Sequence, residues 1–279
     1  MATLEDQVIL VTGSTDGIGK QTAYGLAQRG ATVLLHGRSQ EKGEATLREI
    51  RDATGNDKLE YYFADFSSLA EVRRLADEVR ANLDALDVLI NNAGVGAGKR
   101  GEAKRELSRD GYELRFAANY LAPYLLTRLL LPALRRAAPS RIVNVASAAQ
   151  NPIDFDDVML ERRYDGFGAY AQSKLALVMF TFDLAEKLKS EDIAVNCLHP
   201  GSLLDTKMVR EAFGRAMGSV QSGADAVIYL ATSSKVEGVT GKYLDQKQEA
   251  RAHEQAYDGE ARNNLRQLSE KLTGSQNEP

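Results

Sequence analysis

The chain has 279 residues, of which 43% are hydrophobic and 27% charged, and its formal net charge is −4. These values are ordinary for a globular protein that folds as one large α/β domain or two small ones. The slightly acidic balance gives no electrostatic reason to expect nucleic acid or an anionic membrane as a partner. Cys197 is the only cysteine, which excludes an intramolecular disulfide and suits a reducing compartment.

Membrane segments are not expected from the sequence. The first six residues lack the charged-then-apolar pattern of a signal peptide. The longest apolar stretch, residues 121–134, is broken by Arg128, Pro123 and Pro132 and is too short to cross a bilayer. We therefore predict a cytoplasmic protein with no membrane partner.

Short apolar runs alternate with longer helical patterns along the chain. Strands are predicted at residues 8–11, 32–35, 59–63, 88–90, 142–145, 194–198 and 241–244. This alternation predicts βαβ units, and hence a doubly wound (Rossmann) α/β fold with a parallel sheet and helices on both faces. The ligand of such a sheet binds at the carboxyl edge, where the strand order reverses.

A single domain is predicted to include the whole chain, residues 1–279. Residues 96–110 and 148–168 are predicted to be insertions or loops, and the substrate loops are assigned to residues 148–168 and 202–222. The tail, residues 250–279, is charged but keeps a helical pattern, and its last five residues are predicted to fray.

A glycine-rich turn follows the first predicted strand and precedes a helical pattern. Strand, glycine-rich turn and helix together are typical of dinucleotide binding, because glycines let the backbone approach a pyrophosphate at a helix N-terminus. The alternative is a plain turn in which Asp16 or Thr15 caps the helix. The predicted cofactor-binding residues of this turn are Gly13, Ser14, Thr15, Asp16, Gly17, Ile18 and Gly19.

The end of the second predicted strand bears on the choice of cofactor. An acidic residue near this point holds the ribose 2′-hydroxyl of NAD, whereas an arginine accommodates the 2′-phosphate of NADP. Residues 36–38 contain no carboxylate, and Arg38 is well placed for a phosphate, with Ser39 and Lys42 beside it. We predict NADP, while Glu41 keeps NAD open as the less favoured cofactor.

Tyr170 and Lys174 form a Tyr-x-x-x-Lys step, and Ser147 follows the predicted fifth strand. Positions i and i+4 share one face of a helix, so Lys174 is expected beside the Tyr170 phenol. A nearby cation favours the phenolate and moves its pKa toward the working range. The spacing alone is common in helices, so the prediction depends on further motifs.

Five motifs occur together in one order. They are Thr12-Gly-x-x-x-Gly-Ile-Gly19, Asn91-Asn92-Ala93-Gly94, Ser147, Tyr170-x-x-x-Lys174 and His199-Pro200-Gly201. This set resembles the short-chain dehydrogenase/reductase family over residues 4–244. Residues 34–42 and 265–272 resemble the soluble bacterial relatives of retinol dehydrogenases.

The resemblance implies an oxidoreductase that transfers a hydride between a nicotinamide cofactor and a small-molecule carbonyl or alcohol. Tyr170 would be the general acid or base, and Ser147 would hydrogen-bond the substrate oxygen. Lys174 would lower the pKa of Tyr170 and bind the nicotinamide ribose, and Tyr170 is predicted to contact the cofactor as well. Asn119, within a helix predicted at residues 112–131, would hold a water in a proton relay. The alternative for Asn119 is an asparagine satisfied within its helix.

The resemblance also implies the other cofactor contacts. Asp65 and its neighbour Phe66 would bracket the adenine; helix capping is the alternative for Asp65, although Ser68 supplies a cap without it. The segments that would line the ribose and pass the nicotinamide comprise Asn91, Ala93, Gly94, Pro200, Gly201, Leu203 and Thr206. Thr206 lies one position later than the family's threonine, so its own contact stays open. His199 is interpreted as structural, and no metal site is predicted.

The substrate is suggested only by aromatic residues between Ser147 and Tyr170. This interval includes Gln150, Pro152, Phe155, Tyr164 and Phe167, and the Phe and Tyr residues among them favour an apolar or aromatic substrate, unless they only anchor the loop. A stripe of Met208, Phe213 and Met217 is more typical of a core than of a pocket.

Two other functions remain open at this stage. One is a catalytically silent NADP(H)-binding regulatory protein of the same fold, which the retention of both Tyr170 and Lys174 disfavours. The other is an interaction scaffold whose polar tail binds a partner. The resemblance further implies a homodimer or homotetramer, because family members commonly pair the helices that hold Asn119 and Tyr170.

Overall fold

The computed structural model describes residues 4–98 and 104–275. Its eight strands form one sheet in the order β3-β2-β1-β4-β5-β6-β7-β8. The strands are β1 (Val8–Val11), β2 (Thr32–Gly37), β3 (Leu59–Phe63), β4 (Val88–Asn91), β5 (Ser140–Val145), β6 (Ile193–His199), β7 (Tyr243–Asp245) and β8 (Gln248–Glu249). Neighbouring strands from β3 to β7 are parallel, and β8 is antiparallel to β7. The predicted doubly wound α/β fold is confirmed.

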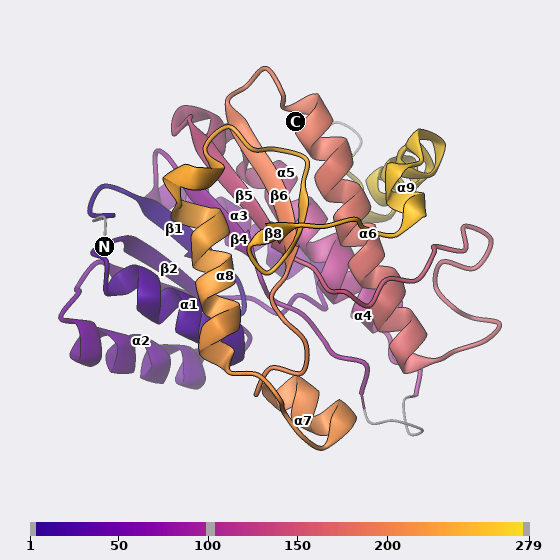
Figure 1. Ribbon diagram of the computed structural model, residues 1–279, viewed down its shortest axis with the longest axis horizontal. Helices are drawn as coiled ribbons and strands as arrows, with labels where there is room; N and C mark the ends of the chain where they lie inside the picture. The colour runs from indigo at the N-terminus through magenta and orange to yellow at the C-terminus, as the bar shows by residue number, and fades with distance from the viewer. Residues whose placement is uncertain (1–3, 99–103, 276–279) are drawn as a thin grey trace.

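Helices cover both faces of the sheet (Figure 1). They are α1 (Gly17–Ala27), α2 (Gln40–Thr54), α3 (Leu69–Asn82), α4 (Leu114–Phe116), α5 (Ala122–Arg136), α6 (Gly166–Lys187), α7 (Lys207–Phe213), α8 (Val220–Thr232) and α9 (Gly259–Thr273). Shorter turns are η1 (Ala117–Leu121), η2 (Ser234–Val236) and η3 (Glu254–Tyr257).

The alternation of side chains along β1 shows how the two layers are built. Ile9 and Val11 belong to the core beneath α1, α2 and α8, whereas Leu10 belongs to the core beneath α3, α5 and α6. All three side chains are fully buried. A central parallel strand buried on both faces is therefore apolar throughout, which is why the sequence pattern located it.

The strand order reverses between β1 and β4, which are neighbours although β2 and β3 lie between them in the chain. The carboxyl ends of these two strands carry the glycine-rich turn and the Asn91–Gly94 segment. β2 extends two residues beyond its predicted end, since His36 and Gly37 still pair with residues of β3.

The helix predicted at residues 112–131 begins two residues later, at Leu114, and ends at Arg136. Its turn η1 is π-helical and contains Asn119. Pro123 has no N–H, so the Asn119 carbonyl four residues earlier lacks the donor that an α-helix would supply. Such π turns are frequent at functional sites.

The C-terminal tail is more ordered than its charge indicated. The helix predicted there is α9, but the fraying predicted from Ser275 is wrong for that residue, whose side chain is fully buried. Residues 276–279 lie outside the described part. In residues 4–98 and 104–275 no helix combines the length and apolar character needed to cross a membrane.

Candidate active site

The glycine-rich turn between β1 and α1 is close-packed against the segment after β4. Gly13 has φ +65°, and a Cβ there would lie 2.7 Å from the Ala93 Cα. A Cβ at Gly19 would lie 2.3 Å from the Gly13 carbonyl oxygen. Larger residues are thus excluded at both positions. Asp16 caps α1 by accepting a hydrogen bond from the Gly17 amide at 2.8 Å, as the alternative interpretation of this turn predicted.

His36, at the end of β2, supports this turn, and sequence reasoning missed it. Its Nδ1 accepts a hydrogen bond from the Gly13 amide at 3.1 Å, and its Nε2 lies 3.1 Å from the Ala64 carbonyl oxygen. Nδ1 therefore carries the lone pair and Nε2 the proton. Burial lowers the pKa of His36 to about 4, so the ring is neutral. The available signal was a histidine ending a strand that is otherwise apolar.

Arg38 follows β2 on the exposed side of the glycine-rich turn. A Cβ at Gly37 would lie 2.7 Å from the Thr15 Cγ2, so the two segments are in contact here. Within the described residues Arg38 has no hydrogen-bond or ion-pair partner. Ser39 caps α2, and the Lys42 ammonium pairs with Asp16 at 2.9 Å. Of the two cations here, Arg38 and Lys42, only the Arg38 guanidinium has no partner within the described part of the chain.

Asp65 and Phe66 lie at the carboxyl end of β3. The Phe66 ring is buried and stacks on His36 with ring centroids 4.4 Å apart. Asp65 accepts a hydrogen bond from the Ser67 amide at 2.9 Å and lies 3.4 Å from the Arg109 guanidinium. Ser68, not Asp65, caps α3. Arg109 was not anticipated, because it comes from a distant loop.

In the segment after β4, the Asn91 side chain faces the core, whereas Gly94 lies beside the candidate site. The Asn91 amide donates to Thr127 at 2.9 Å and to Asn144 at 2.8 Å, so its side chain faces the core and leaves only backbone for the predicted ribose contact. The Ala93 amide donates to the Thr12 hydroxyl at 3.0 Å. A Cβ at Gly94 would lie 3.1 Å from the Asn119 Oδ1 and 3.7 Å from the Lys174 ammonium.

The structure brings Ser147, Tyr170 and Lys174 together at the carboxyl end of β5. Lys174, 5% exposed, donates to the Val145 carbonyl at 2.8 Å, and its ammonium lies 5.8 Å from the Tyr170 ring centroid. Burial lowers the pKa of Lys174 to about 8. Ser147 is buried, and its hydroxyl accepts a hydrogen bond from the Ala149 amide at 3.1 Å.

The pKa of Tyr170 differs from the prediction. Burial raises it, and a hydrogen bond with the Ser147 side chain offsets part of this rise. The predicted lowering by Lys174 is not found, because the ammonium is directed at the Val145 carbonyl. In this structure the Tyr170 phenol is therefore protonated at neutral pH.

Asn119 connects three parts of the site. Its Nδ2 donates to the Val95 carbonyl at 3.0 Å and to the Ser173 hydroxyl at 2.9 Å, and its Oδ1 accepts from the Val95 amide at 2.6 Å. The side-chain amide is thus fully used in holding η1, the segment after β4 and α6 together. Any contact of Asn119 with a relay water would come from its backbone carbonyl.

A buried polar cluster joins the two loops that flank the site. Arg115 and Glu113 are 2% and 1% exposed and lie 3.4 Å apart. Arg115 also donates to the Tyr164 hydroxyl at 2.5 Å and to the Gly96 carbonyl at 2.8 Å. The Tyr164 hydroxyl therefore anchors its loop, which is the second of the two roles considered for the aromatic residues.

The segment after β6 lies over the glycine-rich turn. Gly201 and Leu203 both have positive φ, and the Thr206 Cγ2 lies 3.4 Å from a Cβ at Gly17. Thr206 caps α7. Pro200 is buried beside His199, whose Nε2 lies 3.0 Å from the Ser202 hydroxyl.

The core interpretation of the methionines is wrong for this segment. Met217 is 75% exposed, and Met208 is half-buried where a Cβ at Gly96 would meet it at 2.4 Å. The side chain of Phe213 lies outside the described atoms. The helical spacing does not hold here, because α7 ends at Phe213 and Met217 lies four residues beyond it.

Comparison with known proteins decides the family. Residues 7–217 match the family model of the short chain dehydrogenases. The chain belongs to this family. It is 38% identical over 291 residues to retinol dehydrogenase 13 of Homo sapiens, an alignment that covers 98% of this chain and 86% of the relative.

Two solved structures are similar to this short-chain dehydrogenase. One is an uncharacterized protein from Mycobacterium paratuberculosis, with TM-score 0.81 and 30% identity over 98% of this chain and 96% of that chain. The other is a short chain dehydrogenase from Shigella flexneri complexed with NADP, with TM-score 0.70 and 28% identity over 88% of this chain and 98% of that chain. The family assignment makes the chain an oxidoreductase acting on CH–OH or C=O groups with NAD(P).

The buried lysine of this short-chain dehydrogenase predicts opposite effects on stability and activity. Lys174→Met removes an ammonium whose pKa falls from 10.5 to about 8 on folding, a cost of roughly 3 kcal/mol at neutral pH. The lost hydrogen bond to Val145 offsets about 1 kcal/mol. We expect the variant to be more stable by ~1–3 kcal/mol in urea unfolding at pH 7, and to lose activity.

The pH dependence of the folding stability tests whether the buried Lys174 ammonium destabilises the protein. Between pH 8 and 10.5 the unfolded chain binds more protons at Lys174 than the folded chain, so wild-type stability should rise with pH in this window. The Met variant should lack that rise, and Lys189→Met, at an exposed lysine, should keep it. A Lys174→Met protein less stable than wild type at pH 7 would contradict the desolvation argument.

Proposed function

We propose that the enzyme is an NADP-dependent oxidoreductase that transfers a hydride between nicotinamide and a carbonyl or alcohol, with Tyr170 as general acid and base. The observation that carries this proposal is the convergence of Ser147, Tyr170 and Lys174 at the carboxyl end of β5. This is the edge at which doubly wound sheets bind their ligands.

Each of the three side chains has a distinct task in this proposal. Ser147 donates a hydrogen bond to the substrate oxygen, and Tyr170 transfers a proton to it in carbonyl reduction. The raised pKa of Tyr170 keeps the phenol protonated, which suits the reduction direction. Lys174 binds the ribose of the cofactor beside Gly94 and supplies positive charge near the phenol when that proton leaves.

The dinucleotide fits the carboxyl edge of β1, β2 and β4. Gly13 and Gly19 leave no Cβ between the turn and its neighbours, and the N-terminus of α1 faces the same side. The nicotinamide supplies or accepts the hydride. Arg38, exposed and without a partner among the described residues, supports NADP, as does the NADP complex of the Shigella flexneri relative.

The substrate class is inferred from the loops and from the relative. Retinol dehydrogenase 13 bears the name of an apolar alcohol. In this chain Phe167 is 47% exposed at the start of α6, three residues before Tyr170, and Met217 is exposed in the loop after α7. These apolar side chains favour an apolar aldehyde, ketone or alcohol. The cytoplasmic location stays a prediction.

The proposed activity is tested by following NADPH oxidation with a panel of apolar and polar aldehydes and ketones. We expect turnover with apolar carbonyls, and a ~10²–10⁴-fold lower turnover with the Tyr170→Phe protein. NADPH binding without turnover on any carbonyl, together with no oxidation of the matching alcohols by NADP, would instead support the catalytically silent alternative.

A further inference from the structure

The C-terminal helix α9 packs beside α6 (Figure 1), and its side chains also contact η1 and α5. Its buried side chains recur every four residues, at Ala261, Leu265, Ser269 and Thr273, so one stripe of the helix faces the protein. Leu265 is 1% exposed and Ser269 fully buried. The charged residues of the tail flank this stripe, where Arg262, Arg266 and Glu270 pair with side chains of α5 and α6, or lie on the exposed side of the helix.

The surface beneath α9 is aromatic. Tyr120, Tyr124 and Phe180 form a cluster in which the Tyr124 and Phe180 ring centroids are 5.0 Å apart and those of Tyr120 and Tyr124 6.0 Å. All three side chains are 5% exposed or less. Without α9 they would form an apolar patch of the kind that marks protein interfaces.

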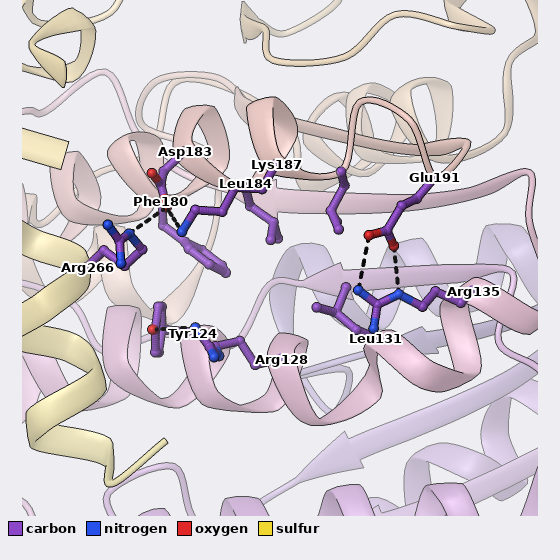
Figure 2. Close-up of a pocket in the computed structure, with 11 residues that line it drawn as sticks. Tyr124, Arg128, Leu131, Arg135, Phe180, Asp183, Leu184, Lys187, Glu191 and Arg266 are labelled. Atoms are coloured by element: carbon purple, nitrogen blue, oxygen red, sulfur yellow. Dashed lines mark hydrogen bonds and ion pairs between the residues drawn. The ribbon is translucent and has the colours of Figure 1, made fainter. Parts of the chain in front are cut away.

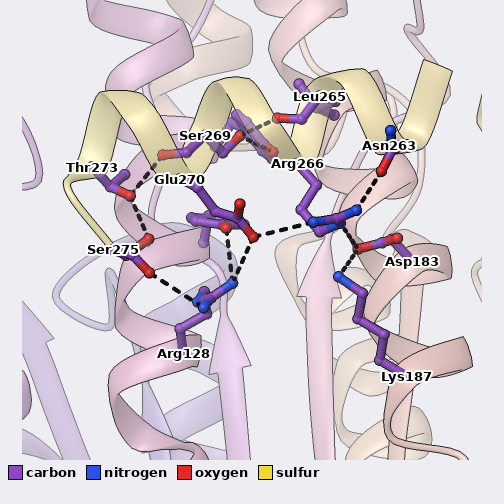
Figure 3. A network of polar contacts seen from close by, with 12 residues as sticks. Arg128, Asp183, Lys187, Asn263, Leu265, Arg266, Ser269, Glu270, Thr273 and Ser275 are labelled. Carbon is purple, nitrogen blue, oxygen red and sulfur yellow. Dashed lines mark hydrogen bonds and ion pairs between the residues drawn. The ribbon is translucent and has the colours of Figure 1, made fainter. Parts of the chain in front are cut away.

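Polar contacts fix α9 in one position on this face. The Tyr120 and Ser269 hydroxyl oxygens are 2.6 Å apart, and the Tyr112 hydroxyl donates to the Leu272 carbonyl at 2.9 Å. Figure 3 shows Arg128 of α5 reaching Glu270. These contacts come from partly or fully buried groups, and they would be lost if α9 left the face.

Ion pairs extend the attachment to α6. Arg262 of α9 lies 3.2 Å from Glu186, and Arg266 lies 3.7 Å from Asp183. Asp183 also pairs with Lys187 at 3.0 Å (Figure 3). The side chains of Arg262 and Arg266 are less than one-third exposed, so these pairs belong to the edge of a closed interface.

The part of the face that α9 leaves uncovered is hollow, with apolar side chains of α5 and α6 in its lining and charged side chains around them. A cavity of about 150 Å³ lies beside α9, which contributes Arg266 to its lining, and none of its lining residues belongs to the candidate active site (Figure 2). Arg135 spans one end of it, donating to the two carboxylate oxygens of Glu191 at 2.6 and 3.1 Å. A second copy of the chain pressed onto this region would have to desolvate these charges, which costs several kcal/mol per ion.

The chain before α9 also covers the edge of the sheet, where β8 pairs with β7. β8 pairs with only two residues of β7, Leu244 and Asp245. Short edge strands with charged neighbours, here Lys242 and Lys247, resist edge-to-edge pairing. The chain from β8 to α9 therefore covers both the outer edge of β7 and part of the outer face of α5 and α6.

We propose that α9 takes the place of a partner subunit on the outer face of α5 and α6, so that this enzyme is a monomer. The homodimer or homotetramer implied by family resemblance requires that face to be free. α9 also contacts Tyr120, the neighbour of Asn119, so the helix supports the turn that carries Asn119 from within the same chain.

The first test is the molar mass of the full-length protein by light scattering, from low to high micromolar concentration. We expect the mass of one chain throughout. A dimer or tetramer at these concentrations would overturn the proposal. This measurement does not depend on catalysis, so it can fail while the proposed activity holds, and the reverse.

The second test loosens α9 in the full-length chain. Leu265→Glu places a carboxylate under the helix and is expected to expose the aromatic face, giving a concentration-dependent increase in mass. Gln267→Glu places the same charge on the exposed side of α9 and should leave the protein monomeric. A folded Leu265→Glu protein that stays monomeric at high concentration would show that α9 is not what keeps this face closed.

A third measurement covers the case in which Leu265→Glu does not fold. Tyr120→Phe keeps the ring and removes only the hydroxyl that contacts Ser269. Hydrogen exchange of the amides of α9 should be faster in this variant than in wild type, while exchange in α1 is unchanged. Equal exchange in α9 would contradict the docking role of this contact.

Discussion

Tyr170→Phe is expected to reduce turnover by ~10²–10⁴-fold, the usual contribution of one positioned proton-transfer group. The substitution removes only the phenolic oxygen, and phenylalanine fills the same space between Ser147 and Lys174. NADPH affinity should therefore stay close to wild type, because the proposed ribose contact belongs to Lys174. The measurements are kcat for carbonyl reduction and the Kd of NADPH by fluorescence titration.

The control for this prediction is Tyr229→Phe, a hydroxyl deletion on α8 outside the candidate active site. It should leave kcat unchanged. Near-normal turnover in Tyr170→Phe, with the fold intact by circular dichroism, would remove Tyr170 from its proposed role.

The same tyrosine predicts opposite pH profiles for the two reaction directions. Burial raises the pKa of Tyr170, so the protonated phenol needed for carbonyl reduction is present at neutral pH. Alcohol oxidation requires the deprotonated form, so its rate should rise with pH from neutral toward alkaline. Lys174, with its pKa near 8, titrates within this range, so the profile belongs to the pair and not to Tyr170 alone.

The part of the fold that the sequence predicts is the part governed by local pattern. Strands β1, β4 and β5 are largely buried, β3 is half-buried, and all four runs were located within two residues of the observed ends. β8 was not predicted, because two exposed polar residues form no pattern. Its pairing depends on the position of β7 in the finished sheet.

In the candidate site, too, the features set by local sequence pattern were predicted and those set by packing were not. Motif spacing predicted that Ser147, Tyr170 and Lys174 would lie near one another, and the structure places them so, while their roles stay predictions. The direction of the Tyr170 pKa was wrong, because it depends on burial and on the target of the Lys174 ammonium, which only the packed structure defines.

Contacts between distant segments were the least accessible from sequence. His36 joins the turn after β1 to the end of β3. Arg115 joins residues that are 19 and 49 positions away in the chain. A buried arginine or histidine has no periodic signature, so its partner is found only when the segments are assembled.

Arg38→Ala is expected to weaken NADPH binding by roughly 10- to 100-fold. A charge-assisted hydrogen bond to the 2′-phosphate is worth ~1.5–3 kcal/mol, and each 1.4 kcal/mol is about a factor of ten in affinity. NADH affinity should barely change, because NADH has no 2′-phosphate. The deciding quantity is the ratio of the NADPH and NADH dissociation constants in wild type and variant. Arg48→Ala, an exposed arginine farther along α2, is the matched control and should not alter the ratio.

The structure also predicts which neighbouring residue should contribute less than Arg38 to the preference for NADPH. Lys42 is held by Asp16 at 2.9 Å, so it is already neutralised and Lys42→Ala should change the ratio less than Arg38→Ala. Ser39 is committed to capping α2 through its hydroxyl. A wild type that prefers NADH would contradict the NADP assignment and direct attention to the ribose hydroxyls. A wild-type preference for NADPH that survives Arg38→Ala would instead transfer the phosphate contact to Lys42 and Ser39, and would require the Asp16–Lys42 pair to open when the cofactor binds.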